Sequence, residues 1–381
     1  MSVDAAPQLI EQIKTANQAG HKLLIQGHSS KRGWMASSRG DDVLDLTGHH
    51  GILQYQPEEL VITARGGTPL TVIEAALAEQ GQMLASEPPC FGANPTRSGT
   101  LGGAVASGLS GPGRPWLGAV RDAVLGVELI NGTGEYLRFG GQVMKNVAGY
   151  DVSRLQAGAW GCLGLLSVLS LRVQPRTELE RTMSAALDAA AAIQLCAELG
   201  RRNLPISGSC WYAGLLYLRL SGNASGVASA CQSLAAAGFT DNDAATELWH
   251  QVNSHQHAFF HRAPPQTQGG DFRGRQKEAK LWRIVTPPAA SMPNFLASPE
   301  QNLLVMWSGG LRWLYHDDAQ AVHDYSNAVG GWCWALGEIM PLEPAQRLIT
   351  QHLMAAFDPK GVFANPLGLV AKENTDLRGG A

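Results

Sequence analysis

The chain has 381 residues, of which 45% are hydrophobic, so it can bury a core large enough for two domains. Its 29 basic and 32 acidic residues give a formal net charge of −3, which argues against a broad cationic surface for nucleic acid or anionic membrane. The six cysteines include no C-x-x-C pair, the spacing typical of iron–sulfur clusters and structural zinc sites.

The first half alternates between predicted helices and predicted strands. Apolar residues at helical spacing predict a helix over residues 6–19, which Gly20 ends. Strands are expected at residues 22–25, 43–46, 51–55 and 59–64. A helix follows at about residues 70–80, with Thr68 as its expected N-cap and Pro69 at the first helical position. This alternation predicts an α+β domain whose sheet is covered on at least one face.

A hairpin and a buried strand complete the first domain. Residues 123–129 and 136–139 flank the turn Asn131–Gly134, a pattern typical of a β-hairpin. The nearly continuous apolar run at residues 163–173 predicts a buried strand, which Pro175 closes.

We therefore expect a first domain at residues 5–176, a second at residues 177–370 and a flexible tail at residues 371–381. An Ala-rich helix is predicted at about residues 184–199. Further strands are expected at residues 209–220, 281–286, 303–307, 311–315 and 332–336, and further helices near residues 224–237, 243–257, 318–329 and 343–356. The second domain is predicted to be an antiparallel sheet with helices on one face.

Two glycine-rich segments have the composition of an anion site. Residues 25–31 directly follow a strand, and their small residues allow backbone N–H groups to converge on an anion such as a pyrophosphate, although an ordinary turn has the same composition. Residues 98–112, within a predicted loop over residues 88–115, carry almost no bulky side chain, so a planar ligand can approach the backbone closely. The alternative, a small-residue helix on a sheet, is disfavoured because glycines weaken a helix.

The third glycine-rich segment, residues 145–166, argues against a nucleotide site of the commonest kinds. Gly158, Gly161 and Gly164 recur every third residue just before the buried strand. A Rossmann site has the opposite order, with the glycines between a strand and a following helix. No G-x-G-x-x-G follows the first strand, and no Walker A pattern is present, so an NAD site and a P-loop are both disfavoured.

Together the three segments resemble the FAD-binding domain shared by relatives of vanillyl-alcohol oxidase and p-cresol methylhydroxylase, over about residues 5–176. In that family a first loop and a Thr-Leu-Gly-Gly segment hold the pyrophosphate and flavin, and a Gly-x-x-Gly-x-x-Gly entry lines the FAD. The resemblance implies these cofactor-binding residues: Gly27, His28, Ser29, Ser30, Lys31, Pro89, Thr100, Leu101, Gly102, Gly103, Ser107, Gly108, Asp151, Gly158, Gly161, Gly164 and Leu165.

A narrower set of motifs is similar to the E-subunit family of bacterial glycolate oxidases. These motifs are Pro88-Pro89-x-Phe91, Gly108–Pro115, Gly118–Asp122, residues 145–166, Phe259-Phe260 with Leu281–Arg283, and Phe357–Phe363 with Asn365-Pro366. The resemblance implies a subunit that assembles with a paralogous FAD subunit and an iron–sulfur subunit to oxidise glycolate, a small 2-hydroxy acid, to glyoxylate. The chain would relay electrons from its own FAD or support the catalytic paralogue.

The same resemblance implies how the flavin is held and where the protein works. Relatives begin the first loop with arginine and glycines, whereas Gln26, His28 and Ser29 stand here. Covalent relatives tether the flavin through a histidine of this loop, and Ser30 occupies the aligned place, so we expect non-covalent FAD. Without a signal peptide or an apolar run of about 18 residues, a cytoplasmic protein is expected, reaching the inner membrane face only through partners.

The sequence does not identify a catalytic base. His255, His257 and His261 form an H-x-H-x-x-x-H string, which could bind zinc or iron, but a polar helix surface is expected and no metal site is predicted. Relatives that oxidise the substrate themselves carry a Gly-Asn-x-His run, which is missing here. Two alternatives stay open, a self-sufficient FAD-dependent 2-hydroxy-acid dehydrogenase and a flavin-free structural subunit.

Some residues have two possible roles. Arg114, Arg121, Arg154 and Lys145 can meet a pyrophosphate or pair with Asp122 and Asp151. Trp34 and Trp116 are candidates for anchoring a partner subunit, because aromatic side chains dominate interface hot spots, and the alternative is that both pack internally.

Overall fold

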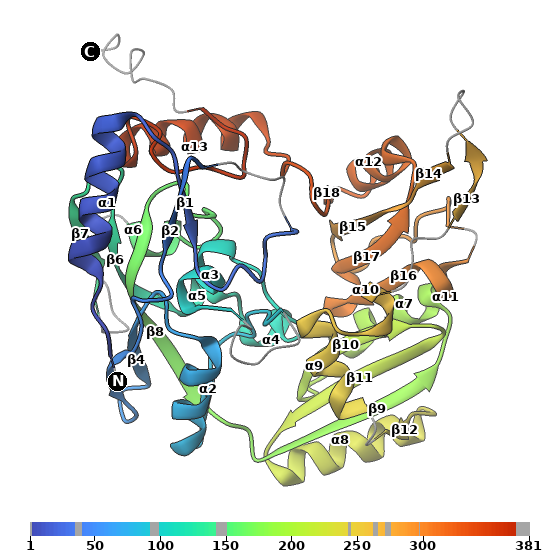
Figure 1. Ribbon diagram of the computed structural model, residues 1–381. Coiled ribbons are helices and arrows are strands. Elements are labelled where there is room, and N and C mark those ends of the chain that lie inside the picture. The colour runs from blue at the N-terminus through green and yellow to red at the C-terminus, as the bar shows by residue number, and fades with distance from the viewer. Residues whose placement is uncertain are drawn as a thin grey trace, which may run out of the picture. The chain divides into compact units, whose positions relative to one another are not determined.

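The computed structural model describes residues 2–34, 40–91, 99–141, 151–242, 245–261, 266–270, 276–296 and 298–370. These residues form two compact units (Figure 1). The first unit contains residues up to Ser110, Gly118–Arg176 and residues from Ile339 onward, and the second contains Gly111–Leu117 and Thr177–Glu338. The chain passes from the first unit to the second after Arg176, and its C-terminal part, from Ile339 onward, belongs to the first unit and not to the second.

The first unit is built on an antiparallel sheet with the order β3-β4-β8-β6-β7, and β5 also pairs with β8. Its strands are β3 (Ile52–Gln56), β4 (Val61–Arg65), β5 (Gln82–Leu84), β6 (Val124–Ile130), β7 (Tyr136–Gly140) and β8 (Leu165–Pro175). The run expected to be a buried strand is the central β8, whose first seven residues are all buried. The hairpin expected around Asn131–Gly134 is formed by β6 and β7.

A separate two-stranded parallel sheet and a set of helices complete this unit. Strand β1 (Leu23–Gln26) pairs with β2 (Asp42–Asp45). The helices are α1 (Ala6–Ala19), α2 (Leu70–Glu79), α3 (Leu101–Ser107), α5 (Val120–Ala123), α6 (Val152–Leu155) and α13 (Pro344–Phe357). Helix α1 ends at Gly20, whose φ of 71° is left-handed, as the sequence predicts.

Two expectations for this unit are wrong. Pro69, not Thr68, is the N-cap of α2, because the Thr68 hydroxyl instead accepts a hydrogen bond from the Gly51 N–H at 2.9 Å. The segment expected to be a loop contains α3, because Thr100 caps its first turn. The disfavoured small-residue helix is therefore present.

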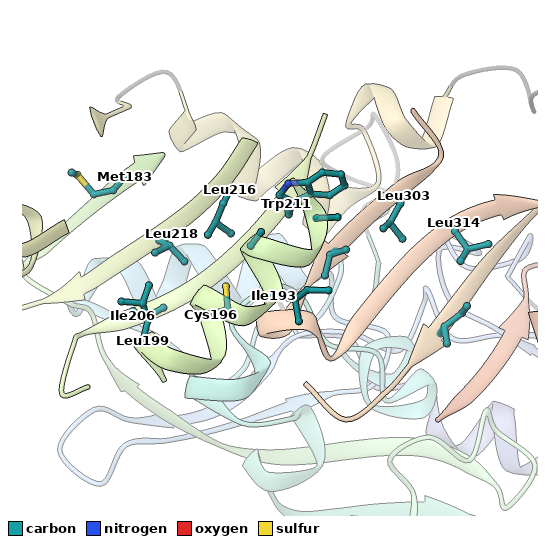
Figure 2. Close-up of a cluster of buried hydrophobic side chains, with 14 of the residues drawn as sticks. Met183, Ile193, Cys196, Leu199, Ile206, Trp211, Leu216, Leu218, Leu303 and Leu314 are labelled. Carbon is teal, nitrogen blue, oxygen red and sulfur yellow. The ribbon is translucent and has the colours of Figure 1, made fainter. Parts of the chain in front are cut away.

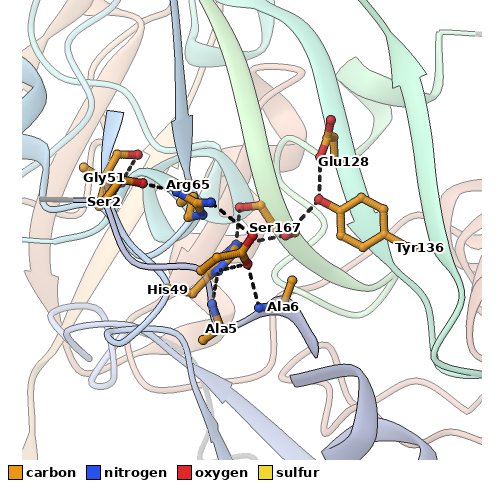
Figure 3. A network of polar contacts seen from close by, with 11 residues as sticks. Ser2, Ala5, Ala6, His49, Gly51, Arg65, Glu128, Tyr136 and Ser167 are labelled. Atoms are coloured by element: carbon orange, nitrogen blue, oxygen red, sulfur yellow. Dashed lines mark hydrogen bonds and ion pairs between the residues drawn. The ribbon is translucent and has the colours of Figure 1, made fainter. Parts of the chain in front are cut away.

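A buried polar network joins the N-terminus to the sheet (Figure 3). His49 is 1% exposed, and its Nδ1 accepts from the Ala5 N–H at 3.1 Å, so Nε2 carries the proton that faces the Ser167 hydroxyl at 3.0 Å. The Tyr136 hydroxyl bonds Glu128 and lies 3.3 Å from the same Ser167 hydroxyl. Burial lowers the pKa of His49, which keeps the imidazole neutral.

The second unit is an antiparallel sheet of eight strands with the order β12-β9-β11-β10-β16-β17-β15-β18. The strands are β9 (Leu179–Ala186), β10 (Ile206–Tyr212), β11 (Leu215–Gly222), β12 (Thr240–Asp241), β15 (Lys280–Val285), β16 (Leu303–Met306), β17 (Leu311–His316) and β18 (Trp332–Ala335). The strand expected at residues 209–220 is a hairpin, since Ala213 and Gly214 both adopt positive φ and turn the chain.

The helix predicted at residues 184–199 is wrong in its first part. Residues 179–186 are β9, which pairs with β11 along its whole length, and α7 (Ala189–Leu199) begins only after Asp188. The Asp188 carboxylate accepts from the Ala191 N–H at 2.8 Å, which fixes the start of the helix.

Helices α7, α8 (Ala224–Ala236) and α12 (Ala319–Ala328) bury their apolar sides in one cluster with one face of the sheet (Figure 2). Trp211, Trp282 and Leu314 belong to this cluster. Helices α9 (Thr246–Ser254) and α10 (Ala258–His261) contact strand residues whose side chains point to the opposite face of the sheet. Helices therefore cover both faces of this sheet, and the expectation of helices on one face is wrong.

The remaining elements are short. They are α4 (Arg114–Leu117), α11 (Pro299–Asn302), the 3-10 turn η3 (Trp307–Gly309) and a small hairpin of β13 (Gln266–Gly270) and β14 (Gln276–Glu278). In the described part of the chain, no helix has both the length and the apolar character that crossing a bilayer requires.

Candidate functional site

A cavity of about 760 Å³ lies in the first unit, where the three glycine-rich segments meet the C-terminal segment. Its volume is in the range of small-molecule and cofactor sites, about 300–1,000 Å³. The cavity is lined by Leu24, Ile25, Gln26, Gly27, His28, Ser29, Ser30, Lys31, Arg32, Gly40, Asp41, Asp42, Val43, Leu46, Thr100, Gly102, Gly103, Ala106, Ser107, Trp160, Gly161, Gly164, Leu166, Ala364 and Pro366.

The first loop follows β1 and forms one wall of the cavity. The wall is crowded at Gly27, where a larger side chain has no room. A Cβ on Gly27 would lie 2.5 Å from Thr100 Oγ1, so only glycine fits there. Ser29 adopts a φ of 58°, a backbone conformation that costs free energy in a residue other than glycine. Its hydroxyl is buried and has no hydrogen-bond partner among the described residues, which leaves a polar atom at the cavity for a ligand.

Helix α3 forms the second wall. The Thr100 hydroxyl accepts from the Gly103 N–H at 3.2 Å and so caps the helix. Gly102 allows close backbone packing, because its N–H donates to the Gly66 carbonyl at 2.7 Å and a Cβ there would lie 3.0 Å from that oxygen. Glycines in this helix therefore permit contact with the sheet on one side and line the cavity on the other.

The third segment packs against the end of α3. The Trp160 N–H donates to the Ala106 carbonyl at 2.8 Å, and the Gly158 N–H donates to the Val105 carbonyl at 3.1 Å. Gly161 and Gly164 then turn the chain into β8 with φ values of 80° and 142°, which are accessible chiefly to glycine. These bonds place Trp160, Gly161 and Gly164 at the cavity.

The C-terminal segment closes the cavity after a turn organised by Asp358, which is 1% exposed. Its carboxylate accepts from the Val362 N–H and the Phe363 N–H, both at 2.8 Å. Burial raises the pKa of Asp358, while these backbone hydrogen bonds oppose that rise. The turn directs the chain onto β1, where the Ala364 N–H donates to the Leu23 carbonyl at 2.9 Å.

Charge is unevenly distributed around the cavity. Lys31 lies with its Nζ 5.4 Å from the centre of the Phe91 ring, and burial lowers its pKa to about 8. Burial raises the pKa of the neighbouring Cys90 thiol to about 12, so Cys90 stays neutral and does not balance the Lys31 charge. Asp41 and Asp42 contribute carboxylates elsewhere on the lining.

The structure brings most of the expected cofactor residues together. The expected residues on the cavity lining are Gly27, His28, Ser29, Ser30, Lys31, Thr100, Gly102, Gly103, Ser107, Gly161 and Gly164. The others do not line it: Pro89, Leu101, Gly108, Asp151, Gly158 and Leu165.

Most of the expected residues that do not line the cavity have structural roles next to it. Leu101 and Leu165 are buried in the hydrophobic core, at 1% and 0% exposure. Gly108 and Gly158 pack backbone to backbone, since a Cβ on Gly108 would lie 2.9 Å from Gly158. Asp151 caps α6, and its carboxylate lies 3.3 Å from the Arg154 side chain. Of the two roles that the sequence allows for Arg154, the structure shows the ion pair with Asp151. Lys145 lies outside the described residues.

Sequence reasoning missed several lining residues. Trp160 lies between two predicted glycines but is not itself a glycine or a polar residue. Asp41 and Asp42 come just before a predicted strand, and only the parallel pairing of β1 with β2 brings them to the first loop. Ala364 and Pro366 belong to the C-terminal motif, whose return to the first unit no local pattern indicates.

The histidine string is not a polar helix surface, so that expectation is wrong. Helix α9 ends at Ser254, and His255 is a left-handed C-cap that stacks on Phe260 with ring centres 3.9 Å apart. His257 packs edge-on against Tyr212 at 4.8 Å. Across the residues that the structure describes, no group of three or more potential ligands gathers to hold a metal ion.

Trp34 does not serve as an exposed anchor, because it is 6% exposed and its ring lies 4.6 Å from that of Phe91. Trp116 is 36% exposed and stays a candidate.

The cavity combines features that suit an anionic dinucleotide. For phosphate oxygens it offers glycine-lined backbone, a serine hydroxyl without a hydrogen-bond partner among the described residues, and a lysine that forms no ion pair with a described carboxylate. It also offers carboxylates that can accept hydrogen bonds from hydroxyl or amino groups, and an indole beside the glycines. An FAD molecule, with its pyrophosphate, hydroxyls and planar rings, fits this set of donors and acceptors.

Comparisons with known proteins agree with this chemistry. Residues 2–140 match the family described as FAD binding domain. The chain is similar to the glycolate oxidase subunit GlcE of Escherichia coli (strain K12), with 40% identity over 369 residues that cover 95% of this chain and 97% of the relative. It is also similar to the glycolate oxidase subunit GlcD of Bacillus subtilis (strain 168), with 29% identity over 162 residues, 42% of this chain and 33% of that relative.

Among solved structures, alkyldihydroxyacetonephosphate synthase superimposes with a TM-score of 0.65 at 13% identity, covering 93% of this chain and 73% of that chain. This likeness concerns the fold alone. Together with the family match, it confirms the expected α+β fold with an FAD-binding domain followed by an antiparallel-sheet domain.

Proposed function

Because the chain belongs to the family of the glycolate oxidase subunit GlcE, we propose that it is an FAD-binding subunit of a complex that oxidises glycolate to glyoxylate. The observation that carries the proposal is the 40% identity along 95% of the chain and 97% of the relative, which leaves neither unit unmatched. The chain is thereby an oxidoreductase subunit acting on the CH–OH group of a 2-hydroxy acid.

The FAD occupies the cavity of the first unit and is held without a covalent bond. Backbone N–H groups of the first loop, together with the Lys31 ammonium and the Ser29 hydroxyl, would hold the phosphate groups. Trp160, Gly161 and Gly164 would line the surface for a planar ring, and Ala364 and Pro366 would line the cavity beside it. When bound, FAD supplies a two-electron acceptor. The functional FAD domain thus comprises the region expected at residues 5–176 together with the C-terminal segment.

Substrate oxidation belongs to a paralogous subunit, and this chain relays electrons or supports that subunit. The support is that a chain named as another subunit of glycolate oxidase matches this one over only 162 residues at 29% identity, as a distant paralogue would. An iron–sulfur subunit completes the relay to the final acceptor. All six cysteines of this chain are free, which favours the reducing cytoplasm, with docking to the inner membrane face through partners.

Copurification from the native host tests this proposal. An affinity-tagged chain is expected to copurify with a larger paralogous flavoprotein and an iron–sulfur protein, and the isolated chain is expected to show flavin absorbance. A chain that purifies alone and reduces a dye with glycolate is instead a self-sufficient dehydrogenase. A chain that copurifies but carries no flavin is a structural subunit, and either result refutes the proposal.

A further inference from the structure

Two arginines converge on one indole ring in the second unit. Arg283 lies on β15 directly opposite Trp313 of β17, on the sheet face away from the cluster that contains Trp282. Its guanidinium carbon is 5.4 Å from the centre of the Trp307 ring and 5.9 Å from that of Trp313. The guanidinium of Arg114, which belongs to the same unit, lies 4.7 Å from the Trp307 ring.

Arg283 is buried without an anionic partner. It is 9% exposed, and no described residue forms a hydrogen bond or ion pair with it. The other buried arginines of this sheet are paired. Arg312, at 0% exposure, donates to the carbonyls of Gly309, Ala290 and Ser291 and to the Tyr325 hydroxyl, and Arg219 donates to Ser207 and lies 3.8 Å from the Glu180 carboxylate. A buried cation without a partner is costly, so a bound anion would relieve the cost.

The electrostatic surroundings of Arg283 are positive. Burial lowers the pKa of Arg283 to about 9, and the charge of Arg114 lowers it further in the same direction. Burial lowers the pKa of the nearby His255 to about 3, with added contributions from Arg283 and His261. Each of these groups thus disfavours charge on its neighbours, and among the described residues no carboxylate pairs with Arg114 or Arg283.

The chain holds Trp307 close to both charges at a conformational cost. Trp307 and Ser308 both adopt left-handed φ values, 56° and 54°. The Trp307 indole N–H donates to the Gly111 carbonyl at 2.8 Å, and the Ser308 N–H donates to the Ser209 hydroxyl at 2.6 Å. These two bonds fix the orientation of the indole ring that both guanidinium groups approach.

We propose that Arg114, Arg283 and the face of Trp307 form a binding site for a small carboxylate in the second unit. The planar guanidinium fork matches a carboxylate with two parallel hydrogen bonds. The choice of a 2-hydroxy acid as the carboxylate rests on the proposed function, whereas the need for an anion does not. The site gives this chain a carboxylate-binding site of its own, whichever subunit performs the oxidation.

Calorimetric titration of the full FAD-loaded chain with glycolate and oxalate tests the site. We expect each carboxylate to bind with a stoichiometry of one per chain. Arg114→Met is expected to weaken carboxylate binding at least about tenfold, corresponding to about 1.4 kcal/mol. Arg114 is exposed, so Arg114→Met avoids the folding risk that Arg283→Met would carry. Arg283→Lys should retain only part of the wild-type affinity, because lysine keeps the positive charge but not the guanidinium fork.

Arg202→Met is the matched control, since it removes an exposed arginine of the same unit and should bind like the wild type. The inference is overturned if glycolate and oxalate do not bind, or if Arg114→Met binds them as tightly as the wild type. Loss of glycolate oxidation on deletion of the chain, combined with no carboxylate binding, overturns this inference alone. Carboxylate binding combined with normal glycolate oxidation in the deletion strain overturns the proposed function alone.

Discussion

Gly27 and Thr100 lie so close together that a Cβ at residue 27 would fall 2.5 Å from Thr100 Oγ1 and 2.9 Å from its methyl carbon. The two residues belong to different glycine-rich segments, and both line the same cavity. Because the Thr100 hydroxyl also caps α3, a displacement of the first loop is transmitted to the helix that forms the opposite wall.

We predict that Gly27→Val loses FAD. The added side chain must push the first loop away from Thr100, which separates the two walls that hold the cofactor. Flavin content after gel filtration, measured by absorbance against protein concentration, should fall by at least about tenfold, a cost of about 1.4 kcal/mol in binding. Gly33→Val is the control, because a Cβ at Gly33 meets no atom within 4 Å, and it should keep its flavin. Full flavin content in Gly27→Val would refute the contact.

FAD affinity is predicted to fall above pH 8 through Lys31. The pKa of Lys31 in the free chain is lowered to about 8, so the ammonium is charged below this pH and neutral above it. An anionic ligand binds the charged form better, so affinity is highest below pH 8 and falls by up to about tenfold per pH unit above it. Titration of the apo-protein with FAD at pH 7 and pH 9 measures the change.

Lys31→Gln should bind FAD at least about tenfold more weakly at pH 7 and with no pH dependence from this group. Lys22→Gln, which does not alter the cavity lining, should keep the wild-type profile. The same decline above pH 8 in Lys31→Gln would show that another group is responsible.

Asp358→Ala is predicted to lower the free energy of unfolding by roughly 2–4 kcal/mol, because the N–H groups of Val362 and Phe363 lose a buried charged acceptor. Urea denaturation measures this loss. Asp122→Ala removes an exposed carboxylate that accepts one backbone hydrogen bond, from Ala119 at 3.0 Å, and should cost less than about 1 kcal/mol. Equal losses in the two variants would mean that the turn at Asp358 contributes no special stability.

The flavin is predicted to be non-covalent. His28 and Lys31 line the cavity, but Ser30 occupies the place that the tethering histidine takes in covalent relatives. Acid precipitation of the purified chain should therefore release the yellow colour into the supernatant, and His28→Ala should behave in the same way. Colour that stays with the precipitated wild-type protein, and is lost in His28→Ala, would instead identify a tether at His28.

The sequence predicts those parts of the fold that local pattern controls. The apolar run of β8, the turn between β6 and β7 and the capped helix α1 all follow from neighbouring residues. The pattern misleads at the start of the Ala-rich segment, since residues 184–186 belong to the predicted helix but are paired to β11 across the sheet. Tertiary pairing outweighs helix propensity there.

The candidate site shows the same division. Glycines at the close contacts, such as Gly27 and Gly161, are recognisable because no other residue fits their backbone or their neighbours. Asp41 and Pro366 reach the cavity through strand pairing and through the C-terminal return, which depend on residues far away in sequence. Such residues become evident only when the chain is folded.

Glycolate-dependent dye reduction in extracts of a strain lacking this chain tests the central claim most directly. Deletion should abolish the activity although the paralogous subunit is intact. The wild-type chain and the control Gly33→Val should each restore it, and the flavin-deficient Gly27→Val should not. Normal glycolate oxidation in the deletion strain, or full restoration by Gly27→Val that lacks FAD, would contradict the account.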